Sequence, residues 1–218
     1  MPDDNIDLPA PQGSSNGYSD GRRAASTREN VRNILSTLAV LLIAPAVALI
    51  LTAFIFQSYQ VDGPSMQTTL SNNDRLIVWK TPRTWSRLTR HAYIPNRGDI
   101  IVFVAHGLGD LNGNPDKQLI KRVIGLPGER VVVKNNVLTV YNKAHPKGFR
   151  PDATLPYGKV ITDTQGEIDE IVPKGSVFVC GDNRDNSLDS RSFGPVASSD
   201  IVGKLIMRVL PLDQAKRF

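Results

Sequence analysis

The chain has 218 residues and a formal net charge of +5, and 40% of its residues are hydrophobic. This ordinary composition excludes a collagen-like or wholly disordered chain, and a single long apolar run excludes a multi-span transporter. The lone cysteine, Cys180, excludes an internal disulfide framework and a cysteine-based zinc site. The basic residues form no run longer than two and do not interleave with aromatic residues, so the charge favours anionic lipid over nucleic acid as a partner.

The N-terminal part of the chain combines a polar tail with an apolar run. Residues 1–33 are rich in Asp, Ser, Gly and Pro, which predicts a disordered tail. Between Ile34 and Phe56, 19 of 23 residues are hydrophobic and none is charged. As a helix this run would be about 34 Å long, enough to cross a hydrocarbon core of about 30 Å. We therefore predict a transmembrane anchor over residues 34–57.

A cleavable signal peptide is the alternative interpretation, because Ala46-Val47-Ala48 has the form of a cleavage site. The apolar run continues well past that site, which favours an anchor. The basic residues of the tail are Arg22, Arg23, Arg28 and Arg32. Since the first basic residue after the run is Arg75, the positive-inside rule places the N-terminus in the cytoplasm and residues 58–218 on the outer side.

Short segments rich in Val and Ile dominate residues 58–218, and each is bounded by Gly, Pro, Asn or Asp. This is the pattern of strands. The segments are Arg75–Trp79, Asp99–Val104, Leu119–Ile124, Arg130–Val133, Val137–Tyr141 and Ser176–Cys180. No uncharged helical stripe of 12 or more residues follows Phe56, so we predict a mostly β, antiparallel domain. Residues 142–170 are weakly patterned and predict an insertion or large loop.

The first candidate for chemistry is Val61–Leu70, directly after the apolar run. Its Gly63-Pro64 pair predicts a bend that exposes the Ser65 hydroxyl and leaves backbone N–H groups free. A nucleophilic serine needs that exposure, together with donors for an oxyanion. The alternative is a plain turn.

The second candidate is Leu119–Gly128, in which alternation places Lys121 on the same strand face as Leu119 and Val123. Burial on an apolar face lowers the pKa of a lysine, and a neutral amine can act as a general base. The alternative is an exposed Lys121-Arg122 pair on an edge strand.

The third candidate is Gly181–Gly194, which carries three Asp, two Arg, two Asn and three Ser among fourteen residues. Such a run favours an internal network of ion pairs and side-chain caps over a solvated loop. The histidines His91, His106 and His145 have no metal-ligand spacing, so no metal site is predicted.

Taken in order behind an N-terminal span, these segments resemble bacterial type I signal peptidases, the Ser-Lys enzymes that remove signal peptides from exported proteins. The resemblance rests on Gly-Asp-Asn-Arg-Asp-Asn-Ser-x-Asp-Ser-Arg from Gly181 and Ile-Lys-Arg-Val-Ile-Gly-Leu-Pro-Gly from Ile120, with Val61–Leu70 and Arg97–Phe103 in support. It implies the antiparallel β fold shared with the SOS-repressor peptidases. It also implies a bacterial plasma membrane location, with the catalytic domain on the periplasmic side, and no metal or organic cofactor.

The resemblance also implies roles for individual residues. Ser65 would be the nucleophile, Lys121 the general base, and Ser187 a serine that hydrogen-bonds and orients the lysine. Two structural ion pairs would lie near the site, Asp189–Arg191 and Arg122–Asp182. Gly63 stands where some members have a serine that donates to the oxyanion, which leaves backbone or water as donors here. Thr68 replaces a usual proline.

The implied partners are signal-peptide-bearing preproteins and the lipid bilayer, and we expect a monomer. The preprotein would lie extended near Val61 and Leu119–Lys121, with small residues at positions −1 and −3 in shallow apolar pockets. The candidate walls of these pockets are Val61, Met66, Leu70, Val102 and Ile120.

Other interpretations stay open at this point. One is a self-cleaving SOS repressor or a conjugation-specific maturation protease, although the anchor and the lack of a DNA-binding segment oppose the repressor. Another is an inactive membrane-tethered scaffold, which the joint presence of Ser65, Lys121 and Ser187 opposes. An organellar membrane is an alternative to the bacterial one.

Overall fold

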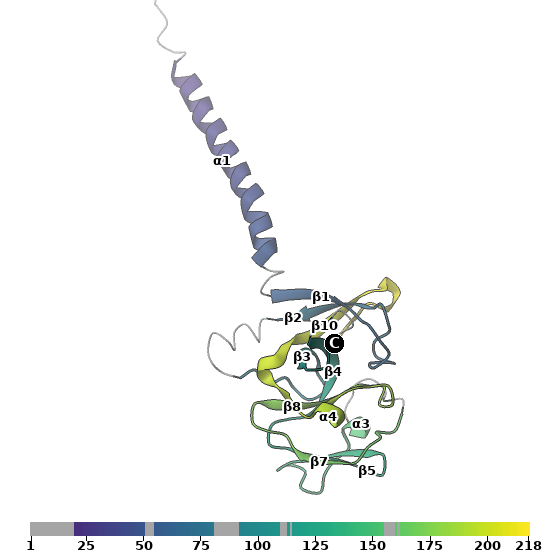
Figure 1. Ribbon diagram of the computed structural model, residues 1–218. Helices are drawn as coiled ribbons and strands as arrows, with labels where there is room; N and C mark the ends of the chain where they lie inside the picture. Colours follow the sequence, from purple (N-terminus) through teal and green to yellow (C-terminus); the bar gives the residue numbers. More distant parts are fainter. Residues whose placement is uncertain are drawn as a thin grey trace, which may run out of the picture. The chain divides into compact units, whose positions relative to one another are not determined.

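The structure is a computed structural model that describes residues 20–50, 55–80, 92–109, 113, 115–154, 160 and 162–218. The chain divides into two compact units, Met1–Leu49 and Ile50–Phe218. In the first unit the long helix α1 spans Asp20–Ile50 (Figure 1). Its segment Val31–Leu49 has a mean hydropathy of 1.8, is exposed throughout, and is long enough to cross a membrane.

Helix α1 differs from the sequence prediction at both ends. It begins at Asp20, so the predicted disorder of residues 1–33 is wrong for residues 20–33, while residues 1–19 lie outside the described part. Residues 22–33 contain no Gly or Pro and several good helix formers, which explains the longer helix. The helix ends at Ile50, and strand β1 (Phe56–Gln60) begins inside the predicted 34–57 anchor because its residues pair with β2.

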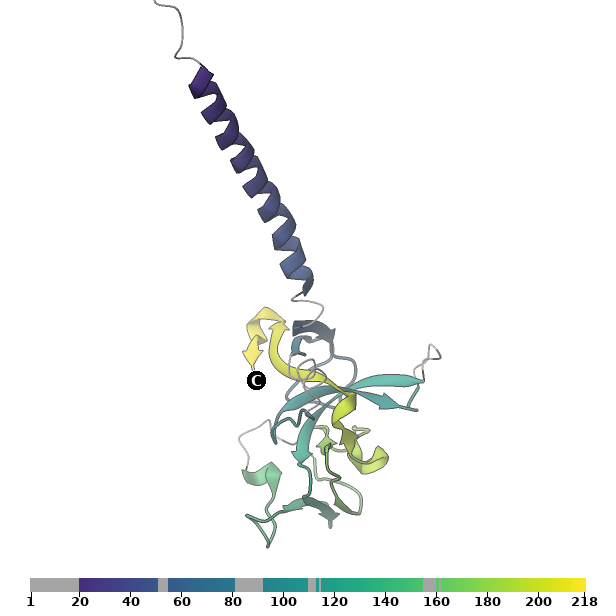
Figure 2. The same ribbon diagram turned by 90° about the vertical axis from the view of Figure 1, so that its left-hand side faces the viewer.

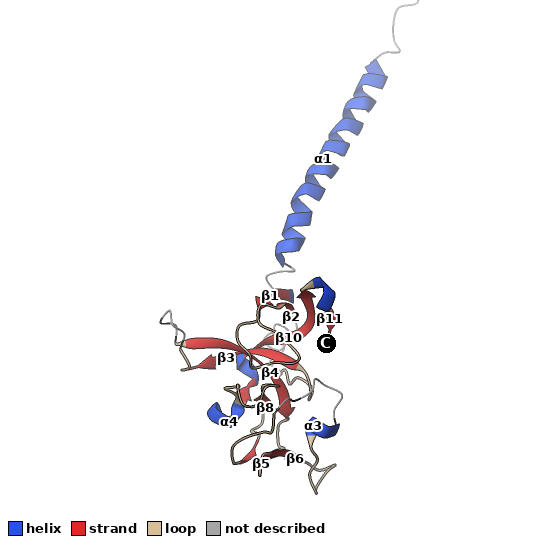
Figure 3. Ribbon diagram, turned by 90° about the vertical axis from the view of Figure 1, so that its right-hand side faces the viewer, coloured by secondary structure: helices blue, strands red, loops and turns tan. Residues whose placement is uncertain are grey.

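The second unit consists mostly of antiparallel strands, as predicted (Figure 3). Its larger sheet has the order β1-β2-β10-β3-β4-β8-β9, and β11 pairs with β10. The bounds are β2 Arg75–Trp79, β3 Ile100–His106, β4 Asp116–Gly125, β8 Ser176–Cys180, β9 Val196–Ala197, β10 Ile201–Leu210 and β11 Lys216–Arg217. The smaller sheet has the order β6-β5-β7, with β5 Arg130–Lys134, β6 Val137–Tyr141 and β7 Ile168–Ile171.

Short helical turns complete the unit: α3 Pro151–Thr154, α4 Ser190–Phe193, η2 Ser198–Asp200 and η3 Leu212–Gln214. All six strands predicted from the sequence are present, whereas β1, β7, β9, β10 and β11 were not predicted. In the weakly patterned region 142–170, α3 and the first three residues of β7 are regular, and the other described residues are mostly turns and loops, as predicted.

The core of the second unit lies on both faces of the larger sheet, because side chains of β3 alternate between them. Ile101 and Phe103 pack into a first cluster with Val123 and Val179. The neighbouring Val102 packs on the opposite face. That opposite face also holds a cluster made of Val61, Met66, Leu70, Leu76, Ile100 and Leu205. A further cluster joins the smaller sheet to Ile124, Phe178 and Cys180.

Gly125, at the end of β4, lies at a close contact between the two sheets. A Cβ added there would lie 2.6 Å from Val131 Cγ2 and 3.0 Å from Phe178 Cβ. Because both neighbours are fully buried, they cannot move aside freely. We expect Gly125→Ala to lower the free energy of unfolding by about 1–3 kcal/mol, measured by urea denaturation of the detergent-solubilised chain. The exposed Lys174→Ala is the control, and equal midpoints for the two variants would contradict this packing.

Candidate active site

Ser65 lies in a turn between β1 and β2, and hydrogen bonds and buried side chains hold this turn in place. The N–H of Gly63, which has a φ of +94°, donates to Asn72 Oδ1 at 3.0 Å. The Leu70 N–H donates to the Met66 carbonyl at 2.8 Å, and both side chains are fully buried. The turn is therefore anchored in the core, with Ser65 partly exposed above it.

The loop after β8 approaches this turn closely at Gly181. A Cβ at Gly181 would collide with the Ser65 carbonyl oxygen and with Ser187 Oγ, so only glycine permits the approach. The Asn183 N–H donates to the Ser65 carbonyl at 3.1 Å, and Asn183 Nδ2 donates to the Pro64 carbonyl at 3.3 Å. These contacts fix the backbone of the serine without engaging its hydroxyl.

Lys121 reaches the Ser65 hydroxyl from β4. Its Nζ donates to Ser65 Oγ at 2.7 Å and to the Ile120 carbonyl at 3.0 Å. The side chain is 3% exposed, and Arg122 is equally buried, which excludes the alternative of an exposed Lys-Arg pair. Burial lowers the pKa of Lys121 to about 8, although the nearby carboxylate of Asp189 acts in the opposite direction. With this pKa, roughly one amine in ten is neutral at pH 7, and about half are neutral at pH 8.

Ser187 does not make the hydrogen bond that the resemblance implies. Its Oγ is buried and has no hydrogen-bond partner among the described residues. The hydroxyl lies against Gly181, while Lys121 Nζ bonds to Ser65 Oγ and the Ile120 carbonyl. The expected Ser187–Lys121 hydrogen bond is therefore wrong for this geometry.

The backbone N–H groups around Ser65 are the candidate donors to an oxyanion. The Gly63 N–H is occupied by Asn72, and Pro64 has no N–H. Within the described part of the chain, no acceptor engages the Ser65 N–H. The Ser65 N–H, which lies next to the Ser65 hydroxyl, is therefore free to donate a hydrogen bond to an oxyanion.

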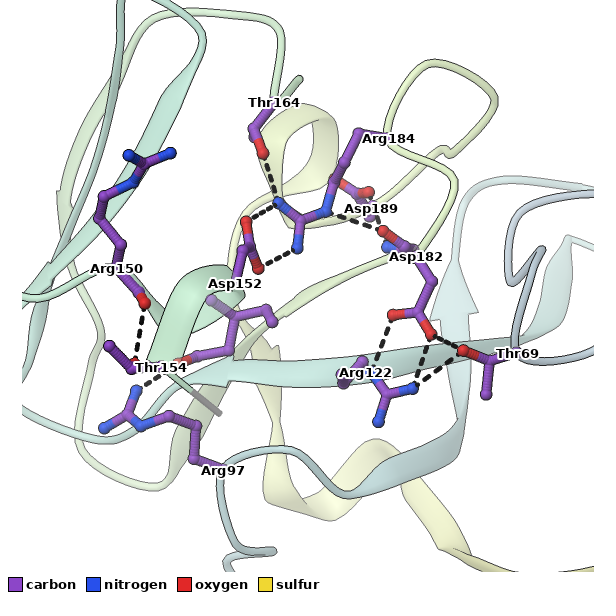
Figure 4. A network of polar contacts seen from close by, with 12 residues as sticks. Thr69, Arg97, Arg122, Arg150, Asp152, Thr154, Thr164, Asp182, Arg184 and Asp189 are labelled. Carbon is purple, nitrogen blue, oxygen red and sulfur yellow. Dashed lines mark hydrogen bonds and ion pairs between the residues drawn. The ribbon is translucent and has the colours of Figure 1, made fainter. Parts of the chain in front are cut away.

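Arg122 and Asp182 form a buried ion pair that joins β4 to the serine turn. Arg122 Nη2 lies 2.6 Å from Asp182 Oδ2, and Arg122 Nε lies 2.8 Å from Asp182 Oδ1. Thr69 Oγ1, from the serine turn, donates to the same carboxylate at 2.5 Å. Figure 4 shows Asp182 between Arg122 and Thr69.

Two further ion pairs hold the loop after β8. Asp189 pairs with Arg191 at 2.8 Å and accepts a hydrogen bond from the Gly181 N–H at 3.0 Å. The fully buried Arg184 pairs with Asp152 of α3 at 2.6 Å and donates to the Gly181 carbonyl at 2.9 Å (Figure 4). The polar run Gly181–Gly194 is thus an internal network rather than a solvated loop. Its partners Thr69 and Asp152 were not found from the sequence, since nothing in their local pattern marks them.

A pocket of about 310 Å³ opens beside Ser65 and Lys121. Three of the predicted wall residues line it: Val61, Val102 and Ile120. Met66 and Leu70 do not, because both are fully buried in the core that supports the turn, so their assignment as walls is wrong. Further apolar lining residues that the sequence analysis missed are Tyr59, Leu76, Leu108, Leu119 and Leu188.

Cys180, His106 and His145 do not line this pocket. Cys180 is a free, fully buried thiol whose pKa is raised by burial. Across the described ranges, no three His, Cys, Asp or Glu side chains gather in the way that a metal ion would require.

In this antiparallel β domain a serine hydroxyl and a buried lysine amine meet at one pocket, a combination that nucleophilic catalysis uses in other proteins. Comparison with known proteins identifies the family to which the chain belongs. The family described as "Signal peptidase, peptidase S26" matches residues 34–210. The chain therefore belongs to the signal peptidase family, peptidase S26, as the motifs predicted, and it is a serine endopeptidase of that family.

Two curated relatives agree with this assignment. Signal peptidase I of Bacillus caldolyticus is 37% identical over 179 residues, which cover 79% of this chain and 89% of the relative. Probable signal peptidase I-1 of Synechocystis is 34% identical over 180 residues, covering 82% of this chain and 83% of the relative. A crystal structure of a signal peptidase I from Enterococcus faecalis is 30% identical, with a TM-score of 0.37, and covers 51% of this chain and 97% of that chain.

The ion pair between Arg122 and Asp182 should be essential for stability. We expect Asp182→Ala to lower the free energy of unfolding by about 3–5 kcal/mol, because it leaves a buried guanidinium without its counter-ion. Chemical denaturation of the full chain in detergent measures the change. Asp169→Ala is a matched control that breaks the solvent-exposed Arg130–Asp169 pair and should leave the midpoint nearly unchanged. A similar loss in both variants would contradict the special role of the buried pair.

Proposed function

We propose that this chain removes N-terminal signal peptides from exported preproteins, with Ser65 as the nucleophile and Lys121 as the general base. The observation that carries the proposal is the 2.7 Å contact between Lys121 Nζ and Ser65 Oγ at a site where burial lowers the lysine pKa to about 8. The names of the relatives, signal peptidase I, support the same activity.

In this mechanism the neutral amine of Lys121 accepts the proton of the Ser65 hydroxyl as Oγ attacks the carbonyl carbon of substrate residue −1. The negative charge on the carbonyl oxygen is stabilised by the Ser65 N–H, since Gly63 offers no side-chain donor. Collapse of the tetrahedral intermediate breaks the C–N bond, and Lys121 gives its proton to the leaving amine. Lys121 then deprotonates a water that hydrolyses the acyl-enzyme, which restores Ser65.

The substrate would bind as an added strand on β4. Among the described residues, positions 117–121 of β4 have strand partners in β3 only, and β8 begins to pair with β4 at Arg122. An extended peptide can therefore add to the other edge of this segment, opposite Val61. Val61, Val102 and Ile120 would form the shallow walls that accept small residues at −1 and −3.

The membrane would hold the enzyme near its substrates. The segment Val31–Leu49 serves as the anchor, with Arg22, Arg23 and Arg28 on the cytoplasmic side and the catalytic unit on the outer side of a bacterial plasma membrane. The protein acts as a monomer without a metal or organic cofactor.

The proposed roles of Ser65 and Lys121 can be tested directly. Detergent-solubilised protein is incubated with a labelled preprotein, and the new N-terminus is sequenced. We expect cleavage after a small residue. Ser65→Ala removes the nucleophile and Lys121→Ala removes the general base, so each variant should lower the cleavage rate about 10³-fold or more. Ser199→Ala and Lys174→Ala, both exposed and outside the pocket, are the matched controls. Cleavage by Ser65→Ala at the wild-type rate would disprove the assignment.

The lowered pKa of Lys121 predicts the pH dependence of cleavage. Protonated lysine cannot accept the serine proton, so kcat/KM should fall about tenfold per pH unit below the pKa of about 8 and level off above it. Initial rates between about pH 6 and pH 9, with a peptide that carries no titratable side chain, measure this profile. A flat profile across that range would contradict Lys121 as the base.

A further inference from the structure

The catalytic pocket lies along an edge of the β3–β4 hairpin and draws residues from both faces of the sheet. The hairpin extends beyond the neighbouring strands (Figure 2). Val102 and Ile120 pack with the cluster that includes Val78 and Val202. Leu108 and Leu119 also line the pocket, but they pack against the cluster on the opposite face. The pocket therefore has two rows of apolar side chains, one on each side of the β4 edge.

Leu188 adds to the pocket from the loop after β8. The polar run Gly181–Gly194 has two large apolar residues: Phe193 packs against the core, whereas Leu188 lines the pocket and is 48% exposed. Its two neighbours in sequence are fixed: Ser187 lies against Gly181, and the fully buried Asp189 is held by the Gly181 N–H and by Arg191. A large apolar side chain on a fixed backbone, exposed at a catalytic pocket, is suited to contact a ligand.

We propose that Leu188, together with Leu108 and Leu119, forms a subsite for the substrate side chain at −2 and favours a large apolar residue there. This inference rests on the proposed function, in which the peptide extends along β4. Side chains of an extended peptide alternate, so −1 and −3 face the row of Val102 and Ile120, and −2 faces the opposite row. The exposed Lys117 lies on the same strand face as Leu119, so this row also disfavours a basic side chain at −2.

The test uses the full chain in detergent and peptides that span one cleavage site and differ at −2 alone, with Leu, Ala or Lys. For the wild type we expect kcat/KM for Leu to exceed that for Ala by about fivefold, because several methylene groups are removed from water, and Lys to be cleaved most slowly. In Leu188→Ala the preference for Leu over Ala should fall below about twofold. Leu188→Met should keep the preference, because it retains a large apolar side chain.

Two controls separate recognition at −2 from a general structural effect. Leu212→Ala removes a leucine that is 79% exposed in η3 and outside the pocket, and it should keep the wild-type preference. A second peptide set that varies only −3 should give the same ratios in the wild type and in Leu188→Ala. Leu188→Gln, which keeps the size but adds polarity, is the second variant and should lose the preference as Leu188→Ala does.

The outcomes distinguish the two proposals. If the wild type cleaves none of the peptides and no preprotein, the proposed function fails. If the wild type cleaves them but the Leu-to-Ala ratio at −2 is the same in the wild type, Leu188→Ala and Leu188→Gln, the inference about Leu188 fails and the proposed function stands. A change at −3 as large as that at −2 would also overturn the inference.

Discussion

The burial of the Lys121 amine is the constraint on which the rest of the site depends. Removing a charged amine from water is costly, so burial favours the neutral form and lowers the pKa to about 8. Two carboxylates nearby, Asp189 and Asp182, would oppose this by stabilising the charged amine. Each is paired with its own arginine, Arg191 and Arg122 respectively, at 2.8 and 2.6 Å. The arginines thus balance the acidic charge close to the lysine, and desolvation remains the dominant effect.

The same ion pairs position the two proposed catalytic groups, which are 56 residues apart in sequence. Because side chains alternate along β4, Arg122 points away from Lys121 and reaches Asp182 on the far side of the strand. Asp182 also accepts a hydrogen bond from Thr69, four residues after Ser65. One carboxylate therefore links the lysine strand to the serine turn. Gly181, next to it, allows the loop after β8 to touch the Ser65 carbonyl from the other side.

Local patterns were enough to predict the parts of the site that depend on a single segment. The alternation Leu119-x-Lys121-x-Val123 predicts a buried lysine because the face of a strand follows from spacing alone. The polar run from Gly181 predicts a network, but its partners Asp152 and Thr69 lie in distant segments that only the tertiary fold brings close. Strand β1 was hidden because its first residue, Phe56, continues the apolar run. Met66 was assigned to the pocket from the family resemblance, which does not reveal which side chains of this turn point into the core.

Residues 117–121 of β4 present a strand edge that pairs with no second strand in the described part of the chain. An open strand edge can pair with any extended chain, which makes it a template for a substrate and also for aggregation. Here the open segment is short, because β8 pairs with β4 from Arg122 onward. The exposed Lys117 lies near its outer end, and Lys121 lies at its inner end beside Ser65. A peptide that pairs with this edge therefore lies beside the charged Lys117 at one end and beside the buried Lys121 amine at the other. Repulsion from Lys117 disfavours a basic side chain at the proposed −2 position, while the backbone of the peptide can still lie against Ser65.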